Sequence, residues 1–146
     1  LGKNMDHKTK LILFIVLGLV VATDIITTNY SLYERIPGLN KISHVLGGGA
    51  AALIVTLIFG ELKDMPLHKR YFIIVAGSAF FGVLWELAEY SVTLARSSIP
   101  LLYQYFHSGD LPDTIGDLAT DILGALIFAL LFSIRRNTKK NKKFVK

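Results

Sequence analysis

A chain of 146 residues with 52% hydrophobic residues and a mean hydropathy of +0.49 is more apolar than an ordinary soluble domain, so we expect a membrane protein. The length predicts one compact unit, and the lack of cysteine excludes disulfides, thiolate zinc sites and cysteine nucleophiles. The net charge is +5, and most charged residues lie outside the apolar segments. This separation indicates that the partner is a lipid bilayer and not a nucleic acid.

The first apolar segment, residues 11–30, is long enough for a membrane-spanning helix, since about 20 helical residues cross the hydrocarbon core. It contains one carboxylate, Asp24. A cleaved signal peptide is the alternative interpretation. The apolar run is long for a signal peptide, and residues 20–24 make a poor cleavage site, so we predict a transmembrane helix.

The second apolar segment, residues 42–60, contains His44 and the small-residue run 47–52. In water, three successive glycines oppose a helix. In a membrane, small residues allow helix backbones to approach closely, so we interpret Gly47–Gly49 as packing residues.

The third and fourth apolar segments carry the other carboxylates that lie within apolar segments. Residues 71–94 contain Glu86 and Glu89, and residues 114–134 contain Asp117 and Asp121, with Asp113 just before them. Together the four segments predict an all-α fold, an integral membrane four-helix bundle, with residues 1–146 as a single transmembrane domain.

Lysine and arginine are distributed unevenly between the connections. Thirteen of the 16 lie in the N-terminal segment, the second connection and the basic tail 135–146, and the other three are Arg35, Lys41 and Arg96. The positive-inside rule therefore predicts a multi-pass inner-membrane protein with both termini in the cytoplasm. The basic tail is expected to contact anionic lipids.

The ionisable residues of the four segments fall at one level of this topology. At 1.5 Å per helical residue, Glu86 lies about 22 Å from the cytoplasmic side, and Asp24 lies about 20 Å from it. His44, Asp117 and Asp121 lie within about 10 Å of the outer surface. Asp113, Asp117 and Asp121 share one helix face, and Glu86 and Glu89 share another.

Each of these residues also has a structural interpretation. His44 or Glu86 can bond a neighbouring backbone, and Asp113 can act as an N-cap. Five or six ionisable residues at one depth favour a functional site, because such groups in membrane spans usually mark function. Close carboxylates in a dry place need a cation, bound protons, or pairing with His44 and Arg96.

A set of one histidine and several carboxylates suits a divalent cation, with Mg, Mn, Ca and Zn as candidates. The expected ligands are His44, Glu86, Glu89, Asp113, Asp117 and Asp121, and Glu86 and Asp117 are the expected catalytic residues. Asp24, Tyr90, Arg96 and Thr114 are expected around the cation or its substrate. Because close carboxylates repel one another, Glu86→Gln and Asp117→Asn are expected to leave the stability of the cation-free protein unchanged.

Two sequence elements resemble a bacterial family of inner-membrane proteins. Residues 81–90 contain a W-E-x-x-E-Y element, and residues 113–125 contain a D-T-x-x-D-x-x-x-D element; both are similar to the core of the YjdF-like proteins, which in turn resemble the VanZ-like group. His44 followed by Gly47–Gly49 matches the upstream histidine of that family. The resemblance covers about residues 40–130 and implies a multispan membrane protein, without implying an activity.

Three classes of function fit these observations. The first is a metal-dependent membrane hydrolase or transferase acting on an envelope or lipid-linked substrate, with Arg96 and residues 95–112 holding an anionic head group. The second is a cation-binding or transport protein, for which a homo-oligomer would supply a pathway that four helices alone lack. The third is a structural membrane partner with a bound ion, which would show neither turnover nor flux.

Overall fold

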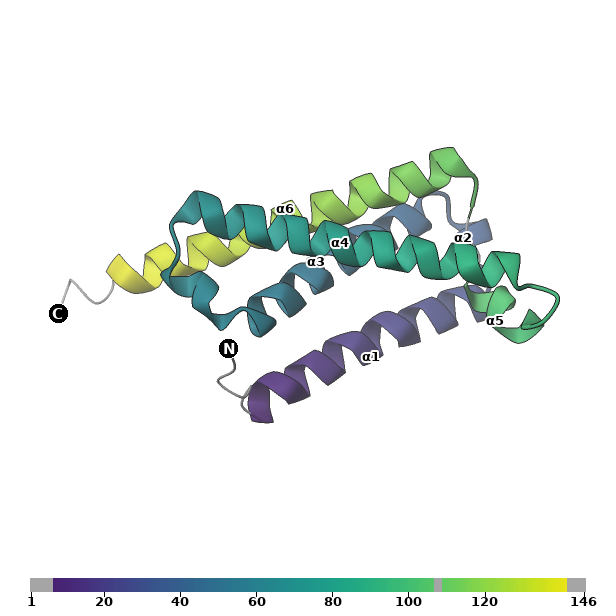
Figure 1. The fold of residues 1–146 in the computed structure, drawn as a ribbon, viewed down its shortest axis with the longest axis horizontal. Helices are drawn as coiled ribbons and strands as arrows, with labels where there is room; N and C mark the ends of the chain where they lie inside the picture. The colour runs from purple at the N-terminus through teal and green to yellow at the C-terminus, as the bar shows by residue number, and fades with distance from the viewer. Residues whose placement is uncertain (1–6, 107–108, 142–146) are drawn as a thin grey trace.

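Helices make up almost all of the described chain. The computed structural model describes residues 7–106 and 109–141, and these ranges contain no strand (Figure 1). The elements are α1 (His7–Asn29), α2 (Leu32–Arg35), α3 (Leu39–Ile58), the 3-10 helix η1 (Gly60–Asp64), α4 (Leu67–Leu94), α5 (Pro100–Tyr105) and α6 (Leu111–Asn141). The predicted all-α fold is confirmed.

Four of these helices are long and apolar enough to cross a membrane. The candidate spans are Lys10–Asn29, Leu39–Ile58, Leu67–Leu94 and Leu111–Leu131. α1 begins and α6 ends at the same end of the molecule as η1, and α2 and α5 lie at the opposite end (Figure 1). This is the arrangement that an even number of spans produces.

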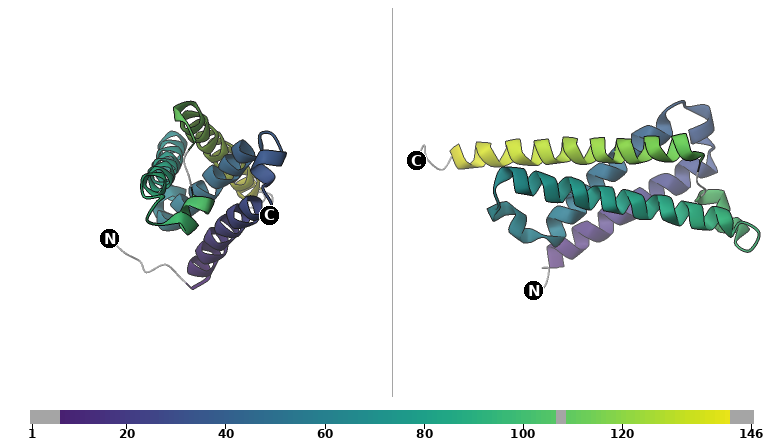
Figure 2. Two further views of the ribbon diagram at one scale, coloured as in Figure 1. Left: turned by 90° about the vertical axis from the view of Figure 1, so that its right-hand side faces the viewer. Right: turned by 45° about the horizontal axis from the view of Figure 1, so that its top comes forward.

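Three of the four long helices form a packed unit. α3 packs most extensively against α6 and also against α4, and α4 packs against α6. α1 lies to one side of this unit (Figure 2) and contacts α3, α2 and α5. Among the α1 side chains that the structure describes, only Thr27 is buried. Most of α1 is therefore available to lipid.

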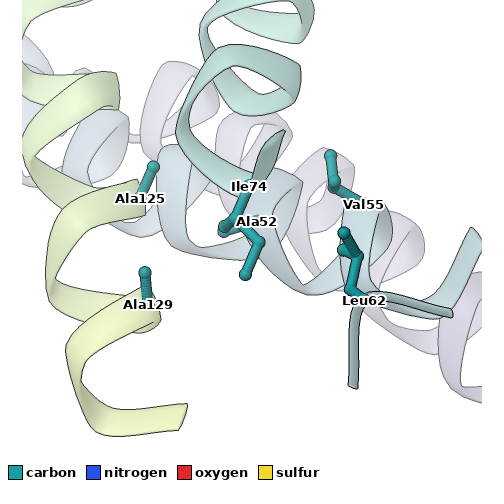
Figure 3. Packing of buried hydrophobic residues seen from close by; sticks show 6 residues of the cluster. All are labelled: Ala52, Val55, Leu62, Ile74, Ala125 and Ala129. Carbon is teal, nitrogen blue, oxygen red and sulfur yellow. The ribbon is translucent and has the colours of Figure 1, made fainter. Parts of the chain in front are cut away.

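Small side chains dominate the core at the crossing of α3, α4 and α6 (Figure 3). The buried cluster consists of Ala52 and Val55 of α3, Leu62 of η1, Ile74 of α4, and Ala125 and Ala129 of α6. Between helices in a bilayer the hydrophobic effect contributes little, because lipid tails are as apolar as leucine. Close van der Waals packing of small residues therefore holds this unit together.

Two glycines set the closest approach of α3 to α6. A Cβ atom at Gly48 would lie 1.9 Å from the backbone oxygen of Asp121, and one at Gly124 would lie 1.9 Å from the backbone oxygen of Val45. No side chain fits at either distance. The packing role expected for the glycine run of the second segment is thus seen at Gly48.

The helices begin several residues before the apolar segments do. α3 starts at Leu39, directly after Gly38, which has a φ of +80° that L-residues other than glycine rarely adopt. α3 therefore includes Lys41, which the hydropathy pattern places in a connection. α4 likewise includes Arg70, whose side chain is buried. Apolar patterning does not detect such polar first turns.

Asp110 caps the N-terminus of α6. Its Oδ1 accepts a hydrogen bond from the backbone N–H of Asp113 at 3.0 Å, as a capping side chain does three residues ahead. Asp113 therefore lies within the first turn and is not the N-cap. At its other end α6 continues to Asn141, so residues 142–146 of the expected basic tail lie outside the described residues.

The sidedness of the protein remains a prediction from charge, and single cysteines test it, because the natural chain has none. We expect Ser98→Cys, in the turn between α4 and α5, to react with a membrane-impermeant maleimide in intact cells. Thr138→Cys, near the end of α6, should react only after permeabilisation. Labelling of Thr138→Cys in intact cells would reverse the assigned orientation.

Candidate metal centre

Three helices bring His44, Glu86 and Asp117 together. One possible ligand atom from each side chain lies within 4.8 Å of the other two. His44 is in the second turn of α3, Glu86 is near the end of α4 and Asp117 is in the second turn of α6, so all three lie in the half of the molecule away from η1. Glu86 is 7% exposed and Asp117 is 4% exposed. The arrangement is a buried set of two carboxylates and one imidazole.

Asp121 interacts with the imidazole of His44 on the side of Nδ1. Its Oδ1 lies 3.3 Å from Nδ1 of His44, whereas Nε2 of the ring lies 3.5 Å from Oδ1 of Asp117. A carboxylate at Nδ1 keeps the proton on that nitrogen and leaves the lone pair of Nε2 for a cation. Metal-binding histidines usually have this kind of partner. Asp121 lies outside the three-residue ligand group, although we expected it to be a ligand.

Glycines leave the space that Asp121 needs. A Cβ at Gly82 of α4 would lie 2.6 Å from Oδ2 of Asp121, and Gly48 of α3 faces the backbone of the same residue. Larger residues at either position would move the carboxylate away from His44. The small residues in α3 and α4 therefore position the site as well as pack the helices.

Glu86 carries an unsatisfied carboxylate oxygen. Its Oε1 is buried and has no hydrogen-bond partner among the described residues, although the Thr114 side chain interacts with the carboxyl group. Buried polar atoms are nearly always paired with protein, water or an ion. The Glu86 carboxylate belongs to the same ligand group as His44 and Asp117, so a cation there has a carboxylate with an unused oxygen beside it.

Lys41 and Asn40 complete the site, and we did not expect either residue there. Nζ of Lys41 lies 2.6 Å from Oδ1 of Asp113 and 2.7 Å from Oδ1 of Asp117. Nδ2 of Asn40 donates to both oxygens of Asp117, at 3.2 and 3.3 Å. Both residues are one turn before His44 on the same helix, which is the signal that would have found them. Asp113 therefore joins the site through Lys41.

Glu89 lies one turn beyond Glu86, outside the three-residue ligand group. Its Oε1 accepts a hydrogen bond of 2.8 Å from the indole N–H of Trp85. The Trp85 ring meets the Phe106 ring edge to face, with their centroids 5.6 Å apart. These contacts connect the end of α4 to the segment that follows α5.

Asp24 of α1 is held by a hydrogen bond from α2. Its Oδ1 accepts a hydrogen bond of 3.1 Å from the Tyr33 hydroxyl, which lies 3.5 Å from Oγ of Ser43. Burial raises the pKa of the Tyr33 hydroxyl, so it stays protonated and continues to donate. Asp24 thus anchors α1 to α2 and lies outside the ligand group.

Two of the expected substrate-contacting residues lie on the surface. Tyr90 is exposed on α4, and Arg96 is exposed in the turn after α4. Within the described part of the chain, Arg96 forms no ion pair, and Lys41 takes the place expected for it beside the carboxylates. The connection between α4 and α6, residues 95–110, contains α5, whose end is linked to α1 by a hydrogen bond from the Tyr105 hydroxyl to Oδ1 of Asn29. His107 lies outside the described residues.

The fold and the buried cluster define a helical multispan membrane protein with an ionisable centre in one half of its spans. The chain belongs to the family described as Predicted membrane protein (DUF2238), whose profile matches residues 3–138. This is the family of the YjdF-like proteins, so that resemblance is confirmed. No curated protein and no solved structure matches the chain.

Proposed function

We propose that this protein binds a divalent cation through His44, Glu86 and Asp117, and uses it in hydrolysis or group transfer on an envelope or lipid-linked substrate. The observation that carries the proposal is the convergence of three possible ligands from three helices within 4.8 Å, with Oε1 of Glu86 left without a partner among the described residues. As part of the same proposal, we infer that this family is related to the VanZ-like proteins. Such a relation would fit an envelope substrate.

The donor set fits such a cation. Two carboxylates and one imidazole suit Mn or Zn, and Mg and Ca are accommodated through their preference for oxygen. A bound divalent cation polarises a phosphoryl or carbonyl oxygen and acidifies a bound water. In this chain Asp121 would orient His44, and Asn40 would orient Asp117. Thr114, whose side chain interacts with the Glu86 carboxyl group, is a hydroxyl beside the proposed ligands.

Ion transport is the second candidate, and the placement of buried charges argues against it. The buried ionisable residues of the described chain are Glu86, Asp117 and Asp121 in one half, and Arg70 near the start of α4 in the other. A cation leaving the carboxylates toward the η1 end would meet the positive charge of Arg70. A catalytic or structural cation that stays in one half of the membrane has no such obstacle.

Two measurements on the full chain, purified in mild detergent, test the proposal. They are the metal content and the thermal stability with added metal. We expect the natural protein to gain thermal stability with Mn or Zn, by about 2.7 kcal/mol at a hundredfold excess over the dissociation constant. Glu86→Gln should lose this gain, because an amide is a weaker ligand than a carboxylate. Glu61→Gln is the matched control, because it removes the same charge from an exposed position in η1.

Absence of any shift with Mg, Mn, Ca and Zn, together with metal-free protein after purification, would refute the cation. Protons shared among the carboxylates and His44 would then be the better explanation. A bound metal with no turnover on phosphate-ester or lipid-linked substrates would favour the structural role over the catalytic one.

A further inference from the structure

The Lys41 ammonium occupies a position that a cation bound to Asp117 would also favour. It lies within 3.0 Å of three oxygens, namely Oδ1 and the backbone oxygen of Asp113 and Oδ1 of Asp117. The same Oδ1 of Asp117 faces Nε2 of His44 at 3.5 Å. One carboxylate oxygen is thus shared between a fixed positive charge of the chain and the proposed ligand group.

The local sequence of α6 accommodates the lysine. A Cβ at Gly116 would lie 3.1 Å from Nζ and 3.3 Å from Cε of Lys41. Gly116 lies between the two aspartates that bind the ammonium. The aspartates and the glycine therefore form a seat in which the lysine side chain lies against the helix.

This seat is on the exposed side of the centre. The side chains of Lys41 and Asp113 are 35% and 40% exposed, whereas that of Asp117 is 5% exposed. A cation that approaches Asp117 from the exposed side passes the lysine. Two cations near one oxygen repel each other strongly in a poorly hydrated site.

We propose that Lys41 is a tethered competitor, whose ammonium shares the Asp117 carboxylate with the divalent cation and weakens binding of that cation. The inference rests on the proposed function, because it concerns access to the same site. When a divalent cation binds, Lys41 gives up Asp117 and keeps Asp113. When no divalent cation is bound, Lys41 neutralises part of the negative charge that the carboxylates bring together.

Titration of the metal-stripped full chain with Mn²⁺ in detergent tests the inference. We expect Lys41→Gln to bind Mn²⁺ about tenfold more tightly than the natural protein, a change of about 1.4 kcal/mol. Lys41→Arg keeps the charge and should bind Mn²⁺ as the natural protein does. Lys69→Gln removes an exposed positive charge from the first turn of α4 and controls for net charge. Circular dichroism establishes that each variant is folded, and Lys41→Met serves if the glutamine variant is not.

The outcomes separate this inference from the proposed function. If the natural protein binds Mn²⁺ and Lys41→Gln binds it equally or less tightly, Lys41 only positions Asp117, and the inference fails alone. If neither protein binds Mn²⁺, the metal centre and the competitor fail together. If only Lys41→Gln binds, the lysine excludes the metal from the natural chain, which supports the inference and overturns the proposed function.

Discussion

Replacing Gly124 with leucine should prevent α3 and α6 from packing together. The position lies at a close crossing of α3 and α6, where a Cβ would come within 1.9 Å of the backbone oxygen of Val45. Neither backbone can move without separating the helices, so the cost should be about 3 kcal/mol or more, the upper end of the range for overpacking. Unfolding in detergent, followed by circular dichroism as dodecyl sulfate is added, measures this loss.

Gly18→Ala is the matched control for that experiment. Among the described residues, no atom beyond the neighbouring turns of α1 lies within 4 Å of a Cβ at Gly18, and alanine favours a helix over glycine by about 1 kcal/mol. Stability should therefore stay the same or rise. If Gly124→Leu were as stable as the natural protein, the close crossing of α3 and α6 would be wrong.

Asp117→Asn should destabilise the cation-free protein, whereas Glu86→Gln should not. Asp117 accepts hydrogen bonds from Lys41 and Asn40, and Nε2 of His44 lies 3.5 Å from its Oδ1. Loss of the Asp117 charge removes one of the two carboxylates that bind the Lys41 ammonium. The free energy of unfolding should fall by about 2 kcal/mol. This is less than for a fully buried ion pair, because the Lys41 side chain is 35% exposed. The sequence alone led us to expect no change for either variant, because it did not place Lys41 beside Asp117.

Chemical unfolding of the metal-stripped variants measures the difference. Both variants should also lose stabilisation by the cation, so they share a binding defect and differ in intrinsic stability. Equal stability of Asp117→Asn and the natural protein would show that Lys41 does not depend on Asp117. A large loss in Glu86→Gln would show that Glu86 is bonded within the protein and is not kept for a ligand.

The helices were predictable from composition because each apolar segment is about as long as a bilayer is thick. Their polar first turns were not, since nothing in the hydropathy of Asn40 and Lys41 distinguishes a helix from a connection. Gly38 and Asp110 are the local signals, a glycine suited to positive φ and a capping aspartate. A lysine in a connection would lie away from the carboxylates, whereas in the first turn of α3 Lys41 binds Asp113 and Asp117.

The candidate site followed from depth and helical spacing only in part. Same-face spacing correctly groups Asp113, Asp117 and Asp121, but it does not give the angle at which α6 faces α3. That angle is fixed by the contacts of Gly48 and Gly124. It places Asp121 beside Nδ1 of His44 and Asp117 beside Nε2. The different roles of Asp117 and Asp121 therefore depend on how α6 packs against α3, and the sequence of α6 alone does not determine that packing.

The loose attachment of α1 determines the order in which the protein comes apart. α1 is held near its C-terminal end by the bonds of Asp24 to Tyr33 and of Asn29 to Tyr105. Lipid solvates the rest of its apolar surface as well as another helix would. Detachment of α1 is therefore a partial opening of low free energy. It leaves α3, α4 and α6 assembled, and with them every ligand of the proposed centre.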